Sequence, residues 1–265
     1  DQPRSRGLGD VYKRQDIDTG YTEWGASGLA AVWAEDNTRE SIYNAFRRKE
    51  TFATTGSRIK VRFFGGYEID DVFNKEDPIN YAYLNGVTMG SDLFQSENKI
   101  PQFMVWALRD LKRAPLDRVQ IIKGWTELSG KPHEKIYDVA CADGRRPDSK
   151  TKLCRDTRAK VNLNNCRISK NLGADELKAV WQDPDFDPNL KAFYYVRVLE
   201  NPTCRWSSWD AIKSGEIPRA DLPATIQERA WSSPIWYIPD NEGITIGNIL
   251  PCLLYTSDAA DDLLC

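Results

Sequence analysis

The stretch that decides the fold is GLAAVWAEDNTRESIYNAFRRKETFATTG, Gly28 to Gly56, because its hydrophobic period changes halfway along. Leu29 to Ala34 is a short continuous apolar run, which is typical of a strand buried on both faces. Asn37 can cap a following helix, and Glu40, three residues later, completes a capping-box-like pair. An apolar stripe with helical spacing then covers Thr38 to Lys49. A strand followed by an amphipathic helix predicts a βα unit, the repeat of parallel α/β folds.

The residues after Gly56 show a different pattern, in which apolar and polar side chains alternate and turn residues separate the runs. Such alternation is typical of strands with one buried face. Strands are predicted at 59–63, 102–108, 118–123, 135–139, 192–200 and 234–238. The stretch from Gly173 to Gln182 is ambiguous, because its apolar residues fit a helix face although the segment is short. Several strands with almost no helix between them predict a mostly antiparallel, sandwich-like or barrel-like domain.

The two ends of the chain carry one DNA word twice. DVYKRQ, Asp10 to Gln15, and CLLYTS, Cys252 to Ser257, can be encoded by the two strands of a transposon end used in preparing sequencing libraries. The tails 1–15 and 252–265 are therefore interpreted as translated adapter DNA and excluded from the fold reasoning. The remainder is expected to be an internal piece of a longer reading frame, with an α+β organisation: the end of a βα domain at 16–58 and a β-rich domain at 59–251.

Composition excludes some classes of partner. The formal net charge of the 265 residues is −3, so a near-neutral chain gives no electrostatic footprint for nucleic acid or an anionic membrane. No apolar run approaches the roughly 20 residues needed to span a bilayer. Hydrophobic residues make up 41% of the chain, which is ample for a core of one large or two small domains. The partner expected is an unidentified small molecule or polymer.

Four of the six cysteines lie outside the tails, namely Cys141, Cys154, Cys166 and Cys204. An even number favours two disulfides, for which three pairings remain open. Free buried thiols and a metal site are the alternatives, but no two cysteines have the spacing of a zinc knuckle. The disulfide interpretation places the protein in an oxidising compartment, either periplasmic or secreted.

Long blocks of the sequence resemble a known family. The blocks are GLAAVWAEDNTRESIYNAFRRKETFATTGSRIKVRFFGG, VQIIKGW, VWQDPDFDP, AFYYVRVLENPTCRWSSWDA and IQERAWSSPIWY. Together they resemble the C-terminal part of a bacterial family catalogued as a domain of unknown function, family 3604. The N-terminal part of that family resembles the polymerase-and-histidinol-phosphatase (PHP) class of metal-dependent hydrolases. The likeness spans nearly all of Asp16 to Tyr237.

The resemblance implies that 16–58 is the last βα unit of a distorted PHP-like barrel, whose missing N-terminal part would lie in cis. It also implies a divalent metal, zinc or manganese, for the parent protein. Such a centre needs several imidazoles and carboxylates, yet the chain has one histidine, His133. His133, in GKPHEK, is interpreted as a surface loop residue. We expect no metal ligand and no cofactor within this fragment, and no activity from it alone.

Glu35 is the candidate catalytic residue. It follows the apolar strand at the carboxyl end, where barrel enzymes gather their active-site groups, so it can form a wall of the metal site. The competing interpretation, which is favoured, is that Glu35 and Asp36 complement the dipole at a helix N-terminus.

Two further patterns have a functional and a structural interpretation. DPDFDP, Asp183 to Pro188, spaces carboxylates as calcium loops do, but Pro188 stands where an EF-hand needs Gly, so an acidic turn is favoured. Aromatic residues can form a carbohydrate-binding face, although aromatics in strands more often belong to the core. The candidates for such a face are Trp125, Trp181, Trp206, Trp209, Trp231, Trp236 and Tyr237.

Two functions from different classes follow. The first is a fragment of a metal-dependent hydrolase that cleaves a phosphate or other ester, a prediction that rests on analogy of fold. The second is a non-catalytic binding or structural module for a surface polymer or glycan.

Overall fold

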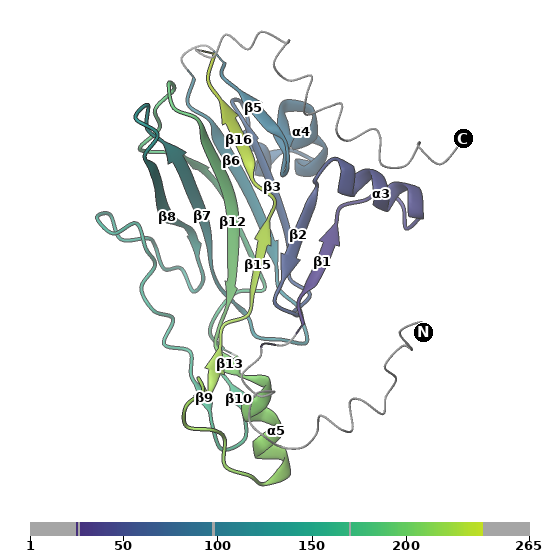
Figure 1. The fold of residues 1–265 in the computed structure, drawn as a ribbon, viewed down its shortest axis with the longest axis vertical. Helices are drawn as coiled ribbons and strands as arrows, with labels where there is room; N and C mark the ends of the chain where they lie inside the picture. The colour runs from purple at the N-terminus through teal and green to yellow at the C-terminus, as the bar shows by residue number, and fades with distance from the viewer. Residues whose placement is uncertain (1–24, 26, 97–98, 170, 241–265) are drawn as a thin grey trace, which may run out of the picture.

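Two packed β-sheets dominate the computed structural model, which describes residues 25, 27–96, 99–169 and 171–240 (Figure 1). The predicted adapter tails, 1–15 and 252–265, lie outside these residues. Among the described residues no helix is both long and apolar enough to cross a membrane.

The larger sheet has eight strands, and β7 and β12 are the neighbouring pair at its centre. Its members are β1 (Leu29–Val32), β2 (Thr51–Thr54), β5 (Asp92–Phe94), β7 (Leu116–Thr126), β8 (Pro132–Cys141), β12 (Ala192–Glu200), β15 (Arg229–Ser232) and β16 (Ile235–Ile238). Strand β12 pairs with β7 along one edge, while its other edge pairs first with β16 and then with β15. All pairs are antiparallel except that of β5 with β16.

The smaller sheet has four antiparallel strands in the order β11, β6, β3, β4. Their bounds are β3 (Lys60–Gly66), β4 (Gly86–Thr88), β6 (Gln102–Leu108) and β11 (Glu176–Gln182). Two short pairs lie outside both sheets: β9 (Val161–Asn162) with β10 (Arg167–Ile168), and β13 (Thr203–Cys204) with β14 (Thr225–Ile226).

Period-two alternation explains how the sheets pack. Along β12, Tyr194, Val196 and Val198 are fully buried, whereas the residues between them are only partly buried. Across the interface the Phe103 ring of β6 lies 4.3 Å from the Tyr194 ring of β12, and within its own sheet it lies 5.7 Å from the Phe63 ring of β3. Burying one such side chain contributes about 1.5–3 kcal/mol. Packing between the two sheets is therefore the main source of stability.

Helices occupy the margins of the sandwich. The 3-10 turn η1 (Val72–Asn74) and α4 (Pro78–Asn85) cover part of the outer face of the smaller sheet, where Phe64 and Met104 are buried with Ala82. Asp77 caps α4, because its carboxylate accepts hydrogen bonds from the backbone N–H groups of residues 79 and 80. Helix α5 (Trp206–Ser214) lies at the lower end of Figure 1.

The deciding stretch forms the predicted strand and helix, β1 and α3 (Arg39–Arg47), but not a parallel βα arrangement. The helix cap is Thr38 and not Asn37, since Thr38 Oγ1 accepts from the Ser41 N–H at 3.2 Å. A tight turn after α3 returns the chain antiparallel to β1 as β2. Consequently β1 is an edge strand with an exposed Leu29, and the described residues close no barrel.

The β-rich part was predicted more closely. All six predicted strands are present as β3, β6, β7, β8, β12 and β16. The ambiguous stretch 173–182 contains strand β11, which pairs with β6. The helices α4 and α5 were not predicted.

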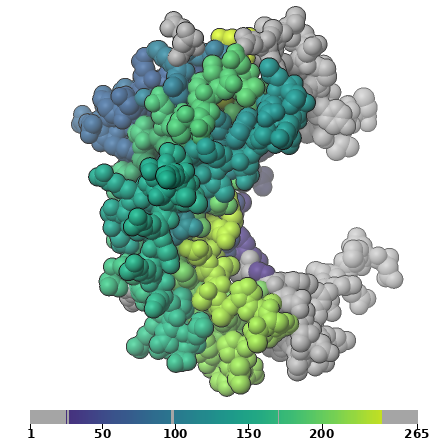
Figure 2. Space-filling model, turned by 90° about the vertical axis from the view of Figure 1, so that its left-hand side faces the viewer, coloured from purple at the N-terminus to yellow at the C-terminus, as the bar shows by residue number. Residues whose placement is uncertain are grey.

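Residues 142–169 and 171–175, here called segment 142–175, have little regular structure and lie beside the sandwich. In Figure 2 its teal-to-green residues run down the β8 side of the molecule towards the yellow-green residues of α5. Two disulfides hold it: Cys141–Cys154, with Cα atoms 6.0 Å apart, and Cys166–Cys204, with Cα atoms 5.6 Å apart. This agrees with the predicted use of the four cysteines and with an oxidising compartment.

Candidate functional site

Glu35 lies at the mouth of a cavity of about 550 Å³ beside β1, α3 and the smaller sheet. We call it the Trp33 cavity. Its lining residues are Trp33, Ala34, Glu35, Arg48, Glu50, Arg62, Asn80, Tyr83 and Thr88. Glu35 is exposed, and among the described residues it has no hydrogen bond or ion pair. It lies three residues before the Thr38 cap, so the structure is compatible with both interpretations of this carboxylate.

Glu50 is the buried centre of the cavity and was not singled out from the sequence. Its side chain is 2% exposed. One carboxylate oxygen accepts from Arg48 Nη2 at 3.2 Å, and the other accepts from Thr88 Oγ1 at 3.2 Å and from the Tyr83 hydroxyl. Arg62 Nη1 lies 3.6 Å from the same carboxylate. A buried charge with this many donors is compensated and fixes the positions of its partners.

Tyr83 connects the two charged groups of the cavity. The Arg62 guanidinium donates to the Tyr83 hydroxyl at 2.6 Å, and the hydroxyl donates to Glu50. Burial, together with the hydrogen bond to Glu50, raises the pKa of Tyr83 to about 12. Tyr83 therefore keeps its proton at neutral pH and acts as a hydrogen-bond donor to the carboxylate.

Trp33 forms one wall of the cavity and also bonds to the backbone of the smaller sheet. Its indole Nε1–H donates to the Val61 carbonyl at 2.8 Å, which satisfies a group on the open edge of β3. The Arg62 guanidinium carbon lies 3.5 Å from the centre of the indole ring. The stacking on one face and the bond to Tyr83 hold Arg62 in place.

The local sequence explains how Glu50 reaches the interior. Two residues after α3 the chain takes a left-handed conformation at Lys49 (φ 58°), and the Glu50 N–H donates to the Ala45 carbonyl at 3.0 Å. Gly90 packs directly against the Lys49 backbone, where a Cβ atom would collide with it. This turn places the Glu50 side chain at the buried end of the Trp33 cavity.

The cavity contains two arginines and two carboxylates, but only one of the carboxylates is paired with the arginines. Glu50 compensates Arg48 and Arg62 from below, whereas Glu35 is at the exposed mouth. Guanidinium groups present planar sets of N–H donors that suit carboxylate and phosphate oxygens. The arrangement is therefore suited to a small anionic ligand with a polar group near Glu35.

Two of the three carboxylates in the acidic turn DPDFDP, those of Asp183 and Asp185, are paired with lysines. Asp183 is buried, 2.6 Å from Lys123 Nζ, and accepts from the Tyr194 hydroxyl at 2.8 Å. Asp185 accepts hydrogen bonds from Lys135 and Tyr137, which lower the pKa of its carboxyl. Within the described ranges no group of three His, Cys, Asp or Glu side chains could hold a metal ion.

His133 lies at the start of β8 and not in a loop. Its ring stacks on that of Trp125 with centroids 5.1 Å apart, and Nε2 is 2.6 Å from Glu127 Oε1. The register of β7 and β8 places the two rings side by side, because Trp125 and His133 are direct partners. His133 therefore has a packing role at the end of the sandwich.

The predicted aromatic candidates fall into different environments. Tyr237 is buried, and Trp181 packs on Tyr137 and Phe103 in the core region. Trp206 and Trp209 belong to α5. Trp236 is 44% exposed on the outer face of the larger sheet.

Two aromatics that were not singled out join Trp236 on that face. The Phe193 ring lies 5.1 Å from Trp236 and 6.3 Å from Tyr195, nearly parallel to the latter. Phe193 lies flat across Gly124 of β7, where a Cβ atom would collide with the ring. We call Phe193, Tyr195 and Trp236 the outer aromatic face.

Another buried carboxyl, Glu200, lies where β12 ends. It is fully buried, and Ser57 is the neighbour whose hydroxyl stabilises its ionised form. Burial raises the pKa of Glu200 to about 8, and the nearby charge of Glu228 acts in the same direction. Glu200 is therefore largely protonated at neutral pH.

The fold and the Trp33 cavity describe a two-sheet β-sandwich with a charged cavity on one flank. A family model described as "Protein of unknown function (DUF3604)" matches residues 3–239, and the chain belongs to this family. The match begins within the predicted 1–15 tail. No curated protein and no solved structure matches the chain.

Proposed function

We propose that the chain is the substrate-binding part of an ester hydrolase and that the Trp33 cavity holds an anionic substrate. The observation that carries this proposal is that Glu35, Arg48 and Arg62 line one cavity of about 550 Å³. The arginines bind the anionic group of a phosphate or other ester, and Glu35 contacts the part of the substrate at the mouth.

The PHP likeness supports a metal-dependent reaction in the parent protein, with zinc or manganese and an N-terminal barrel in cis. The described residues do not fit such a metal, because no three of their His, Cys, Asp and Glu side chains come together to hold one and the histidine is stacked on Trp125. Their part in the reaction is to bind and orient the substrate.

The experiment is calorimetric titration of the chain with inorganic phosphate. We expect saturable binding that Arg62→Ala weakens at least tenfold, because the best-held guanidinium is lost. Glu35→Gln should strengthen phosphate binding several-fold, since it removes a like charge from the mouth. If Glu35 only complements the dipole of helix α3, Glu35→Gln should leave the affinity for phosphate unchanged.

Arg146→Ala is the matched control, because Arg146 is an exposed arginine of segment 142–175 away from the cavity. It should bind phosphate as the unsubstituted chain does. Absence of saturable binding at millimolar phosphate would overturn the proposal.

A second candidate function is glycan binding by the outer aromatic face, which the exposed Trp236 beside Phe193 favours. Sugar rings present apolar faces that flat aromatic side chains can cover. In affinity electrophoresis through gels that contain xylan or dextran, Trp236→Ala should lose the retardation. Trp209→Ala, an exposed tryptophan of α5, should keep it. Equal mobility with and without polysaccharide would remove this candidate.

We also propose a periplasmic or secreted location, which the two disulfides support. Mass spectrometry of natively purified protein should find no alkylatable thiol among the four paired cysteines. Four reactive thiols would contradict both the pairing and the location.

A further inference from the structure

A smaller hollow of about 150 Å³ adjoins the Trp33 cavity. We call it the Leu108 notch, and it is lined by Trp33, Lys60, Arg62, Ile79, Trp106 and Leu108. Trp33 and Arg62 line both hollows, so the two meet at the Arg62–Trp33 stack. The two hollows therefore lie side by side.

The notch exists because α4 covers only part of the smaller sheet. Helix α4 and η1 bury Phe64 and Met104 and cover Trp106 in part, whereas Leu108, the last residue of the same face of β6, is exposed. Leu108 is 39% exposed and pairs with Lys60 across the β3–β6 register. The uncovered apolar floor is thus bordered by cationic side chains.

The notch has fixed walls. Trp106 Nε1 donates to Glu176 Oε1 at 2.6 Å, and the Phe73 ring meets Trp106 edge-on with centroids 5.9 Å apart. Trp33 is held by its bond to Val61. Because these partners fix both indoles, the hollow is preformed and binding costs little ordering of side chains.

Size and lining restrict what the notch can take. An apolar cavity of about 150 Å³ accommodates a benzene-sized ring. The adjoining Trp33 cavity supplies guanidinium groups for an anion. The combination selects a molecule with one flat ring next to one anionic group.

We propose that the substrate is an anionic ester of a single-ring aromatic alcohol, with the ring in the Leu108 notch and the anion in the Trp33 cavity. This inference rests on the proposed anion binding and adds the substrate class.

The experiment compares phenyl phosphate, methyl phosphate and inorganic phosphate by calorimetric titration of the full chain. We expect phenyl phosphate to bind about tenfold more tightly than methyl phosphate, because burial of the ring adds apolar contact. Leu108→Trp fills the notch and should abolish this difference while phosphate affinity is unchanged. Leu128→Trp is the control, because Leu128 is 91% exposed in a different loop.

The outcomes separate the two proposals. If phosphate and both esters fail to bind, the anion-binding function falls, and the ring inference falls with it. If phosphate binds but phenyl and methyl phosphate have equal affinity, only the ring inference is wrong. If Leu108→Trp leaves the preference for phenyl phosphate intact, the ring binds elsewhere and the notch is not its site. A circular dichroism melt of each variant checks that the fold is retained.

Discussion

The sandwich core and segment 142–175 are held together by different forces. In the core, Phe63, Phe103 and Tyr194 are fully buried, and the rings of both sheets interlock. The segment contributes few buried apolar side chains and only the short β9–β10 pair. One disulfide, Cys141–Cys154, ties it to β8 of the sandwich, and the other, Cys166–Cys204, ties it to β13.

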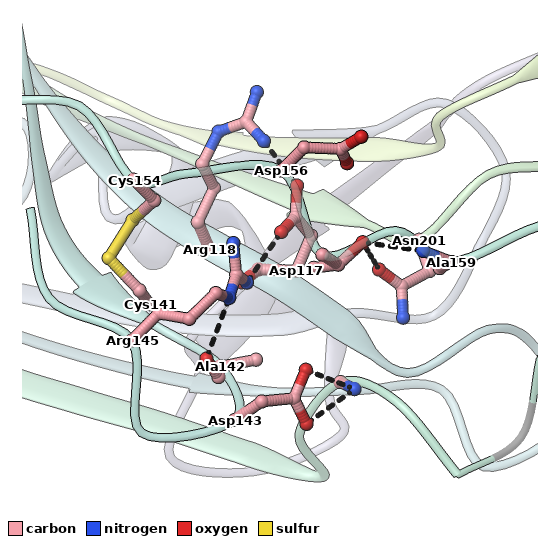
Figure 3. Close-up of polar contacts among 12 residues, drawn as sticks. Asp117, Arg118, Cys141, Ala142, Asp143, Arg145, Cys154, Asp156, Ala159 and Asn201 are labelled. Atoms are coloured by element: carbon pink, nitrogen blue, oxygen red, sulfur yellow. Dashed lines mark hydrogen bonds and ion pairs between the residues drawn. A yellow bond between two sulfur atoms is a disulfide. The ribbon is translucent and has the colours of Figure 1, made fainter.

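Figure 3 shows polar contacts that hold the segment, of which the one from Arg145 to Asp117 of β7 reaches the sandwich. Arg145 of the segment donates to the Ala142 carbonyl at 2.9 Å and to the Asp117 carboxylate at 2.8 Å. Asp143 accepts from the Gly173 N–H through both oxygens, each at 2.9 Å. A region that buries little apolar surface depends on cross-links and buried polar bonds for its order. The two regions should therefore respond differently to substitution.

The largest effect is expected from Phe103→Ala, which removes a ring from the centre of the sandwich. Loss of its contacts with Phe63 and Tyr194 should lower the free energy of unfolding by about 3–5 kcal/mol. Urea denaturation measures this change. Leu111→Ala, at a 78% exposed side chain, is the control and should be nearly neutral. A loss below about 1 kcal/mol for Phe103→Ala would contradict the assignment of the core.

Removal of a disulfide is expected to have the next largest effect on the free energy of unfolding, and the disulfide that closes the longer loop should contribute more. Replacing Cys166 and Cys204 by Ser opens a loop of 38 residues, whereas the Cys141 and Cys154 pair spans 13. Loop-closure entropy gives losses of about 4 and about 3 kcal/mol respectively. Hydrogen exchange should show faster exchange in segment 142–175 while amides of β6 remain protected. Equal deprotection of both regions would show that they unfold as one unit.

Glu200, at the end of β12, tests the sandwich through pH. Its pKa is about 8 in the folded state against an ordinary value of 4.5, so the folded state binds more protons between these pH values. The stability associated with this group is therefore complete below pH 4.5 and is lost as pH rises through 8. Glu200→Gln should be more stable than the unsubstituted chain at pH 9, by up to about 5 kcal/mol, because the pKa is raised from 4.5 to about 8 and one pKa unit corresponds to about 1.4 kcal/mol. Thermal melts at pH 6 and pH 9 measure the difference, and an identical pH dependence in both proteins would refute it.

The smallest effect is expected from Asp143→Ala. Loss of one charge-assisted acceptor for the Gly173 N–H at an exposed position should cost about 1 kcal/mol. The change should appear as faster exchange of the Gly173 amide, with the midpoint of global unfolding nearly unchanged. A large drop in that midpoint would mean that the segment supports the core.

The alternation of apolar and polar side chains predicted the strands, because successive side chains of a strand point to the buried and the exposed face in turn. Strand β6 coincides with the predicted 102–108, and β12 with 192–200. The short helices α4 and α5 give little periodic signal over eight or nine residues, so the sequence did not indicate them. The parallel βα prediction failed because a strand–helix pattern does not say on which side, or in which direction, the next strand returns.

The candidate site was predicted only at its mouth. Glu35 was found from its place after an apolar strand, whereas Glu50 and Arg62 look like ordinary charged residues in KET and KVRF. What brings them together is the left-handed turn at Lys49 and the outward face of β3, which are properties of the tertiary fold. Phe193 and Tyr195 were missed in the same way, because their exposure follows from register with Gly124 and Trp236.

The order of strands in the larger sheet has a consequence for synthesis of the protein. Strand β2 pairs with β15, and β5 pairs with β16. The early strands therefore have no partner until about 140 to 180 further residues have been synthesised. Until the ribosome has released β16, the nascent chain exposes unpaired strand edges and apolar side chains that the finished sheet covers. Holdase chaperones that recognise extended apolar segments should therefore engage the growing chain through most of its translation.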